Sequence, residues 1–518
     1  MPELLQNYAL IVIGGGITGL STAIAWAKNN QTDTRPVLVI EKESAAGGYV
    51  TSFKREGYLF DTVQIIPDSS DVLDYLGISI DLVKFDGYYA RLLLADPESG
   101  STRSLFIPPG VEAFKTYLTD RYLDDRNAIG RFFSYSRALF DELCYLKVEP
   151  SLPDILKILL KCPKIIANSK KTFKRYLDRF NFRNGELLEI FDVFAAFSGL
   201  PTKRVAALLP VSAMMTSLDG SYRPPGGFIE FPHRMKQQLL ALGGHYLGKT
   251  SVERILVDRD RVQGVQVTDG RRFYADYVVT TVDPKVAMQR LLDPKTVRRL
   301  SPSYADKVAK TKMSASAFMI NLGLDDAIDL STFGYNCGYT LLTTGNGAFD
   351  RLYNAYEQGS ALLSPKVFFV PVISPSLPTG RKNALTIFGY PHPAGDWPRL
   401  RETDYTGYSK RKAETADFYI DIVEKFSIPG LRKHIVARDI ASPATFIRYN
   451  GSPTGSKFDM AAYPDNFGRY RLPMRTPVKN LFQPKFSHGI WPSLQAGLQV
   501  VDMIMGGTIM RGNSRYSR

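Results

Sequence analysis

The sequence predicts an α/β fold, and three segments of the 518-residue chain carry this prediction. Residues 9–13 form an apolar, β-branched run, which is typical of a strand buried on both faces of a parallel sheet. A glycine-rich turn and a helix-compatible stretch follow it, and residues 36–41 form a second buried strand. Between residues 222 and 284 the pattern indicates a helix, a β-hairpin and a further buried strand. We therefore expect an α/β fold with a Rossmann-type domain, and the length of the chain suggests two or three domains.

The turn after the first strand has the spacing of a dinucleotide-binding motif. Residues 14–19 read GGGITG, which fits the pattern GxGxxG between a strand and a helix. Gly14 permits the tight turn, Gly16 lets the backbone approach a diphosphate, and Gly19 lets the helix pack close to the sheet. The N-terminus of the helix offers free N–H groups and a partial positive charge to that diphosphate.

An acidic residue at the end of the second strand strengthens this prediction. Glu41 lies 22 residues after Gly19, close to the spacing of a carboxylate that binds a ribose. The alternative is a glycine turn without a ligand in an α/β protein, which leaves the position of Glu41 unexplained. The sequence therefore predicts a bound dinucleotide.

The segment after Glu41 resembles the amine oxidase and phytoene desaturase superfamily. Its glycine pair at 47–48 and the hairpin-like residues 58–61 are similar to the second FAD-contacting loop of that superfamily, which simple NAD dehydrogenases lack. Tyr49 stands where the superfamily often has arginine, and Val63 stands where it usually has glycine. The resemblance implies FAD as the cofactor.

Two later segments extend the resemblance. Residues 222–284 are similar to the second FAD-domain segment, in which the residue matching Val252 packs on adenine; an ordinary core valine is the alternative. Residues 442–505 resemble the C-terminal signature of the phytoene desaturase, carotenoid isomerase and retinol saturase group, in which a glycine-rich loop and a helix N-terminus face the flavin. Gly489 and Ile490 keep that pattern, whereas His488 replaces a glycine.

His488 is the one candidate catalytic residue, as a proton donor or acceptor beside the flavin; a capping or packing role is the alternative. The resemblance implies a discontinuous, Rossmann-type FAD domain of residues 1–95, 206–290 and 440–518. It also implies a substrate or lid domain of mixed sheet and helices, formed by residues 96–205 and 291–439. The predicted cofactor-binding residues are Gly14, Gly16, Ile17, Thr18, Gly19, Glu41, Lys42, Gly48, Tyr49, Val252, Gly489 and Ile490.

The resemblance implies an FAD-dependent oxidoreductase that acts on a long, apolar polyene or isoprenoid, similar to a carotenoid or a retinoid. Hydride would pass between an allylic C–H and flavin N5, with a proton lost from the neighbouring carbon, or the reverse. Desaturation, saturation and isomerisation stay open, as does the oligomeric state. An amine oxidase-like enzyme acting on a polar amine is one alternative, and a non-catalytic FAD-fold scaffold is another. Candidates for a tunnel wall, with a core position as the alternative, are Phe318, Phe333, Tyr335, Tyr339, Phe368 and Phe369.

Residues 151–180 form a basic amphipathic segment that suggests a membrane partner. They contain eight Lys or Arg and two Asp, interleaved with Leu and Ile, and Pro163 divides them into two pieces. Such a segment can lie in the interface of an acidic bilayer. A lid helix packed on its own domain is the alternative.

Composition narrows the remaining classes of function. A net charge of +14 favours anionic partners, but the chain shows no nucleic-acid-binding motif. Its three cysteines are far apart and its five histidines form no ligand pattern, so we expect no metal site and a reducing compartment. Because no stretch of about 18 apolar residues lacks a charge or a break, we expect no conventional transmembrane helix. Together with the reducing compartment and the basic segment, this indicates a cytoplasmic protein that is peripheral on a membrane.

Overall fold

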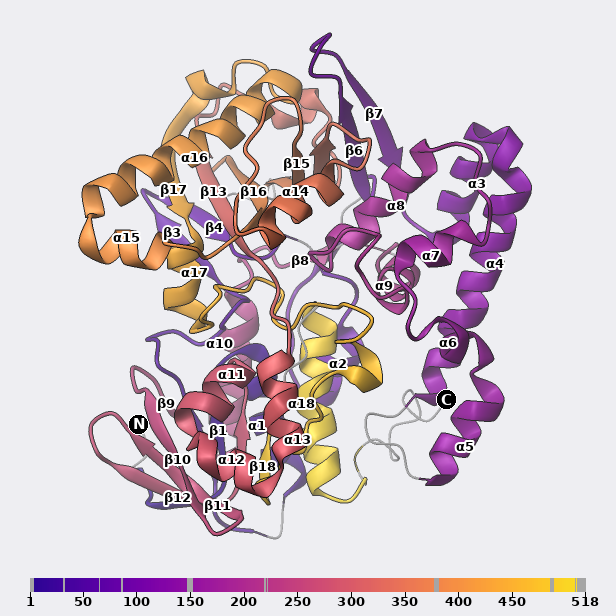
Figure 1. The fold of residues 1–518 in the computed structure, drawn as a ribbon. Helices are drawn as coiled ribbons and strands as arrows, with labels where there is room; N and C mark the ends of the chain where they lie inside the picture. The colour runs from indigo at the N-terminus through magenta and orange to yellow at the C-terminus, as the bar shows by residue number, and fades with distance from the viewer. Residues whose placement is uncertain are drawn as a thin grey trace.

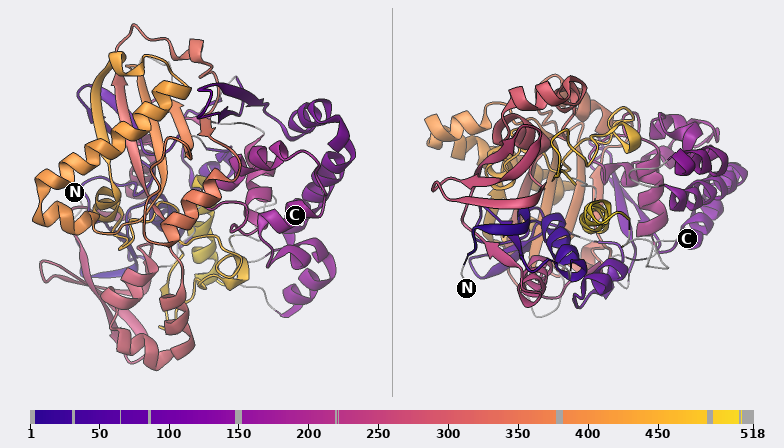
Figure 2. Two further views of the ribbon diagram at one scale, coloured as in Figure 1. Left: turned by 45° about the horizontal axis from the view of Figure 1, so that its top comes forward. Right: turned by 90° about the horizontal axis from the view of Figure 1, so that it is seen from below.

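The computed structural model has an α/β architecture, as the sequence predicts, with two large sheets and a layer of helices beside them (Figure 1). It describes residues 4–30, 33–64, 66–84, 87–146, 152–218, 220, 222–376, 382–484, 489–507 and 509. Two further views show the helical layer on one side of both sheets (Figure 2).

The first sheet has the predicted parallel centre. Its strands run in the order β10 (Val252–Asp258), β11 (Arg261–Val267), β12 (Arg272–Thr280), β1 (Asn7–Ile13), β2 (Val37–Ile40) and β9 (His245–Leu247), and β18 (Leu481–Phe482) pairs with β12. β1 is parallel to β2 and to β12, whereas β11 is antiparallel to β10 and β12. β1 is buried from its second residue onward because it lies in the middle of the sheet.

Helices α1 (Ile17–Asn29), α10 (Glu230–Ala241), α18 (Ile490–Ile504) and α2 (Ser70–Leu76) pack together in one apolar core with β1 and β2. Small residues bring α1 and α18 close together. A Cβ on Gly497 would lie 2.7 Å from the Cβ of Ser21, and the Ser21 hydroxyl donates to the Leu494 carbonyl at 2.7 Å. The contact fixes the N-termini of both helices beside the glycine turn.

The second sheet forms the opposite wall of the molecule. Its order is β17 (Ile435–Ala441), β13 (Ser316–Leu324), β16 (Ala384–His392), β15 (Phe369–Pro375), β14 (Thr340–Thr343), β6 (Ala90–Ala95) and β7 (Thr102–Ile107). One face packs under α16 (Tyr405–Phe426). The other face joins the largest apolar core, which it shares with the helical layer.

The helical layer comprises α3 (Val111–Arg121), α4 (Arg126–Glu142), α5 (Leu152–Lys161), α6 (Pro163–Asn168), α7 (Phe173–Asp178), α8 (Glu186–Ala196) and α9 (Leu208–Ser217). The basic segment is helical, and the chain turns before Pro163, which begins α6. The remaining helices and short strands are β3 (Ser52–Arg55), β4 (Tyr58–Asp61), β5 (Val83–Lys84), β8 (Tyr222–Arg223), α11 (Pro284–Val286), α12 (Pro294–Leu300), α13 (Pro302–Lys310), α14 (Ala348–Glu357), α15 (Trp397–Thr403) and α17 (Pro443–Asn450).

The predicted division into two domains stays a prediction. β6 falls within the expected segment 1–95, yet it pairs with β7 and β14 of the second sheet. Within the described ranges, no helix has both the length and the apolar character needed to cross a membrane.

Candidate functional site

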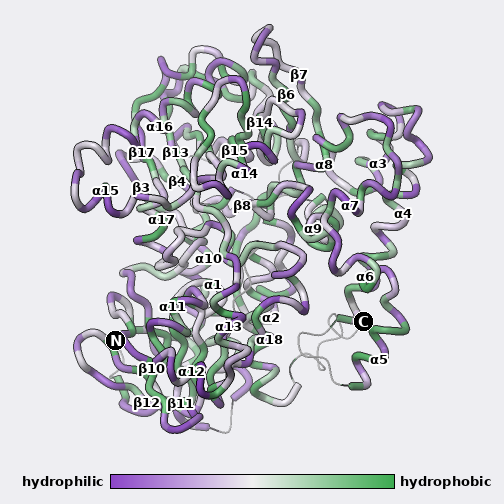
Figure 3. Tube along the Cα trace, viewed as in Figure 1, coloured by the Kyte–Doolittle hydropathy of each residue, from purple (hydrophilic) through white to green (hydrophobic). Residues whose placement is uncertain are grey.

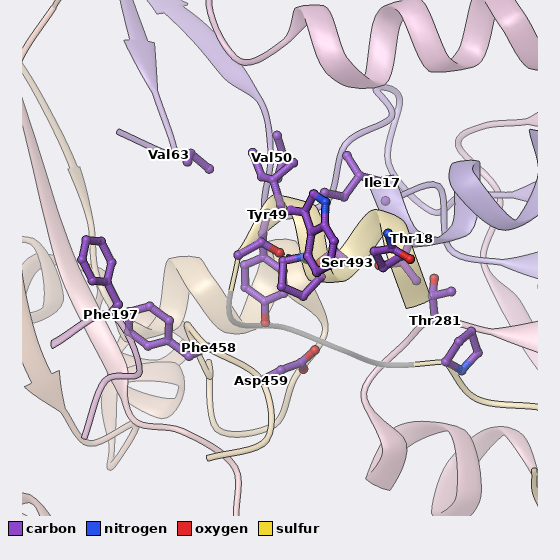
Figure 4. A pocket seen from close by; sticks show the side chains of 18 of the residues that line it. Ile17, Thr18, Tyr49, Val50, Val63, Phe197, Thr281, Phe458, Asp459 and Ser493 are labelled. Carbon is purple, nitrogen blue, oxygen red and sulfur yellow. Dashed lines mark hydrogen bonds between the residues drawn. The ribbon is translucent and has the colours of Figure 1, made fainter. Parts of the chain in front are cut away.

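A cavity of about 2640 Å³ extends from the glycine turn to the helical layer. Small-molecule sites usually measure about 300–1,000 Å³, so this cavity has room for a large cofactor and a second ligand. Figure 4 shows part of it, with Ile17 and Thr18 at one end, Phe197 and Phe458 at the other, and Tyr49 between them.

The glycine turn packs as tightly as its motif requires. Gly14 has a φ of +106°, which favours glycine, and a Cβ there would clash with the hydroxyl of Thr281. A Cβ on Gly19 would clash with the carbonyl oxygen of Gly14, so Gly19 acts by letting the helix approach the turn. Helix α1 begins after Gly16 without a side-chain cap, which leaves its first N–H groups available to an anion in the cavity.

Glu41 stands beside this helix end. Its carboxylate accepts hydrogen bonds from the backbone N–H of Gly15 at 2.6 Å and of Glu43 at 2.9 Å, and it lines the cavity. Val252, the first residue of β10, lines the same end. This end therefore offers a carboxylate for sugar hydroxyls and an apolar side chain for a base.

The loop at 47–51 lies against the turn and continues the cavity wall. The Gly47 N–H donates to the Gly15 carbonyl at 2.9 Å, which brings Gly48 to the wall. The Tyr49 hydroxyl donates to the Ser456 carbonyl at 2.7 Å, and burial holds its pKa well above the usual range. The ammonium of Lys42 donates to the Arg448 carbonyl at 2.6 Å, so this side chain holds the loop to α17.

Helix α18 closes the cavity from another side. Gly489 precedes it, and Gly489 and Ile490 both line the cavity. The amide nitrogen of Gln495, also on the wall, has no hydrogen-bond partner among the residues that the structure describes. Val63 faces the cavity where the resembled superfamily has glycine (Figure 4). His488 lies outside the described residues, and its catalytic role stays a prediction.

The structure thus gathers the sequence-predicted cofactor residues at one end of the cavity. All of them except Gly19 line its wall, although they come from three distant parts of the chain. The donor set fits FAD: an open helix end for a diphosphate, a carboxylate for a ribose, and a wide space beyond Tyr49 for a ring system.

Beyond Tyr49 the cavity becomes a chamber with mainly apolar walls, which we call the apolar chamber. Of the aromatic candidates, Tyr339 lines it, whereas Phe318, Tyr335 and Phe368 belong to the core under α16. Wall residues include Val193, Phe197, Leu208, Leu209, Met215, Phe388 and Tyr390, with Ile155, Ile158, Leu159 and Ile165 from α5 and α6. Sequence reasoning missed most of them, because a chamber wall and a core show the same apolar pattern.

Three charged side chains of one region also reach the cavity wall: Lys457, Asp459 and Arg471. Desolvation lowers the pKa of Lys457 to about 8. It also lowers the pKa of Arg471 to about 10, and the charge of Asp459 opposes that shift. No sequence motif marks them. Within the described ranges no three His, Cys, Asp or Glu side chains form a group suited to a metal ion.

Comparisons with known proteins point to the same cofactor. The family model described as FAD dependent oxidoreductase matches residues 9–317. The inactive all-trans-retinol 13,14-reductase of Danio rerio is 23% identical, over 97% of this chain and 86% of that protein. The chloroplastic prolycopene isomerase of Daucus carota is 23% identical, over 87% of this chain and 72% of its own. A 4,4'-diapophytoene desaturase of Staphylococcus aureus is 23% identical, over 87% of this chain and 88% of that protein.

A solved structure shares the fold. Putrescine oxidase bound to putrescine superposes with a TM-score of 0.63 at 14% identity, covering 96% of this chain and 99% of that one. The three relatives confirm the predicted resemblance to phytoene desaturases and their isomerase and saturase relatives. Because the family model covers more than half of the chain and the donor set suits its cofactor, the cofactor is FAD, and the chain belongs to the FAD dependent oxidoreductase family.

Proposed function

We propose that this oxidoreductase moves hydride between FAD and a long, apolar polyene or isoprenoid. One observation carries the proposal: the cavity runs without a break from the cofactor end into the apolar chamber. A hydrocarbon chain is bound by apolar contact and needs few polar groups. The printed names of the three relatives, which refer to retinol, prolycopene and diapophytoene, support the same substrate class.

The proposed cofactor position follows from the site. The diphosphate lies at the N-terminus of α1, Glu41 holds the ribose, and Val252 covers the adenine. The ring system lies between Tyr49 and the start of α18, formed by Gly489 and Ile490. When bound there, FAD supplies hydride acceptance and donation. The residues of the chain orient the substrate and exclude water.

We also propose that α5 docks the protein on an anionic bilayer. Leu152, Leu156 and Leu160 are 83%, 59% and 74% exposed, and the helix has no buried residue (Figure 3 shows its apolar stretch at the edge of the molecule). Lys157 and Lys161 flank them, over the ring of Tyr145. Apolar side chains beside lysines suit the headgroup boundary of an acidic membrane.

The position of α5 links docking to substrate entry. Ile155, Ile158 and Leu159 of the same helix line the apolar chamber. One helix therefore has apolar side chains toward the chamber and toward the outside. A substrate dissolved in the acyl layer reaches the chamber beside α5 without crossing bulk water.

Anaerobic incubation of FAD-loaded protein with liposomes containing candidate polyenes tests the proposed activity. The flavin spectrum and the double-bond count of the product are followed together. One unsaturation more or fewer indicates desaturation or saturation, and an unchanged count with altered geometry indicates isomerisation. Flavin bleaching by putrescine or another amine, with inert polyenes, favours the amine oxidase alternative. A flavin that neither class alters favours the scaffold alternative.

A further inference from the structure

We infer that Lys457 is the catalytic acid and base of the proposed reaction: its amine takes the proton that the substrate loses, or returns it in the reverse direction. The inference rests on the proposed function, which provides the hydride half of the reaction. It concerns a residue that no sequence motif marks.

The first support for this inference is the position of Lys457. Its Nζ donates to the Thr62 carbonyl at 3.2 Å, and the Thr62 hydroxyl in turn donates to the Tyr49 carbonyl at 2.9 Å. The backbone N–H of Lys457 donates to the Ala315 carbonyl at 3.1 Å, so the residue is also fixed to the second sheet. The amine is therefore held where the loop at 47–51 meets the apolar chamber, beside the place proposed for the flavin ring.

The surroundings of the amine are mainly apolar. The rings of Phe388 and Phe446 each have their centroid 5.5 Å from Nζ. Among the described residues no carboxylate lies within ion-pair distance of it, unlike Lys42 and Lys164 elsewhere on the chain. Among the described residues Nζ makes one hydrogen bond, so two of the three ammonium hydrogens have no hydrogen-bond partner there.

The other titratable groups of the region are less suited to this task. Burial holds the pKa of the Tyr49 and Tyr390 phenols well above the usual range. Asp459 and Arg471 act on each other electrostatically. Asp61, next to Thr62, accepts hydrogen bonds from the Ser52 hydroxyl and the Phe228 N–H. The pKa of Lys457, about 8, lies near neutral pH, and general acid–base catalysis works best when the pKa of the group is close to the pH of the reaction.

Atoms and electrons balance in the proposed step, with FAD as the hydride acceptor and the Lys457 amine as the proton acceptor. In the oxidative direction, one substrate C–H bond breaks and its hydrogen leaves to FAD with the electron pair. The neighbouring C–H bond breaks, its proton goes to the neutral Lys457 amine, and its electron pair becomes the new π bond. The substrate is oxidised and FAD is reduced by two electrons. In the reductive direction the Lys457 ammonium gives the proton to one carbon as the other receives hydride.

Two variants separate proton transfer from charge. Lys457→Met removes the amine, and Lys457→Arg keeps a positive charge but does not release its proton near neutral pH. Both variants should retain the flavin absorbance of the wild type. Both should lose at least about 100-fold of the rate of polyene-dependent flavin reduction, or of reoxidation in the reverse direction. The exposed Lys312, paired with Asp465 at 3.4 Å, supplies the control Lys312→Met, which should react as the wild type does.

A second measurement is independent of turnover. Competitive reductive methylation of the FAD-bound protein at several pH values, read by mass spectrometry, reports the titration midpoint of each lysine. The midpoint of Lys457 should lie near 8, and the pH dependence of the wild-type rate should share it. The inference is overturned by a midpoint near 10.5 or by an Arg variant with the wild-type rate and pH profile.

Different results would contradict the proposed function and the role of Lys457. A wild-type protein that transforms no polyene contradicts the proposed function, and the inference falls with it. A wild-type protein that transforms a polyene while both Lys457 variants keep its rate contradicts the inference alone. Rescue by Arg would assign Lys457 a purely electrostatic role toward the flavin.

Discussion

At the residue scale, the glycine turn shows how little space the cofactor end allows. Gly19→Ala places a methyl group against the Gly14 carbonyl oxygen, in the first turn of a helix that packs on β1. We expect it to reduce the free energy of unfolding by roughly 1–3 kcal/mol and to lower the bound flavin per protein. Thermal unfolding and flavin absorbance measure both effects.

Gly130 provides the matched control for this prediction. It lies within α4, and a Cβ there would meet no atom within 4 Å. Gly130→Ala should keep the flavin content and raise stability by up to about 1 kcal/mol, because alanine favours a helix. Equal losses in both variants would contradict a specific role of Gly19.

Lys457 gives a pH-dependent prediction at the same scale. Its pKa is about 8 in the folded chain and returns toward 10.5 on unfolding, so the folded state disfavours the charged form. Below pH 8 both states are protonated and the cost is present in full. As pH rises from 8 to 10.5 the unfolded state binds more protons, and the cost disappears.

Lys457→Met should therefore be more stable than the wild type at pH 7 by roughly 1–3 kcal/mol. This range is the free energy that corresponds to the pKa difference, reduced by the free energy of the lost hydrogen bond to Thr62. The gain should vanish by about pH 10.5. Urea unfolding at a series of pH values measures it. A variant that is less stable at pH 7 would show that packing around the amine outweighs its desolvation.

At the scale of elements, the sequence predicted the helices and strands that are specified by residues close together in the chain. The strand, turn and helix of residues 7–29 follow from β-branching, glycine spacing and alanine content, and α5 and α6 divide at Pro163 as expected. The tunnel wall could not be predicted in the same way. Phe197 and Tyr390 face the chamber because contacts between distant parts of the chain determine where α8 and β16 lie. The residues next to them in the sequence do not indicate a cavity position.

Substitutions in helix α5 test the proposed membrane docking. Replacing Leu152, Leu156 and Leu160 together by serine should reduce binding to phosphatidylglycerol vesicles at least 10-fold, since each loses exposed apolar surface. Raising the salt concentration should weaken wild-type binding through the lysine component. Co-sedimentation measures both, with phosphatidylcholine vesicles as the neutral comparison.

Leu123 offers the control for this experiment. It is 65% exposed and lies in a short 3-10 turn away from α5. Leu123→Ser should leave vesicle binding unchanged, and all variants should unfold at the wild-type temperature because the side chains are exposed. Unchanged binding of the triple α5 variant would contradict docking through this helix.

At the scale of the whole molecule, the sequence predicted the first sheet and its cofactor end better than the second sheet. Glu41, Gly16 and Ile490 come together because parallel strands bring their carboxyl ends to one edge, a rule that sequence order alone can apply. The second sheet joins β6 to β14 across more than two hundred residues, and no local pattern specifies such a pairing.

The residues at the cofactor end come from distant parts of the chain, so we expect FAD binding to stabilise the whole fold. Its wall includes residues near 14–18, 41–50, 250–252 and 489–495, so FAD in the proposed position needs all of these parts assembled. Free FAD at 100 times its dissociation constant should stabilise the protein by about 2.7 kcal/mol. Calorimetry with and without FAD checks this, and AMP at equal concentration, which lacks the ring system, should stabilise it less. An unfolding temperature indifferent to FAD would contradict the assembled site.

The two apolar sides of α5 have a kinetic consequence. If the ligand arrives from within the lipid leaflet, the quantity that governs turnover is its mole fraction in the membrane, and its total amount per litre becomes irrelevant. Diluting a fixed load of polyene with inert phospholipid would then slow the enzyme, while adding buffer to the same vesicles would not.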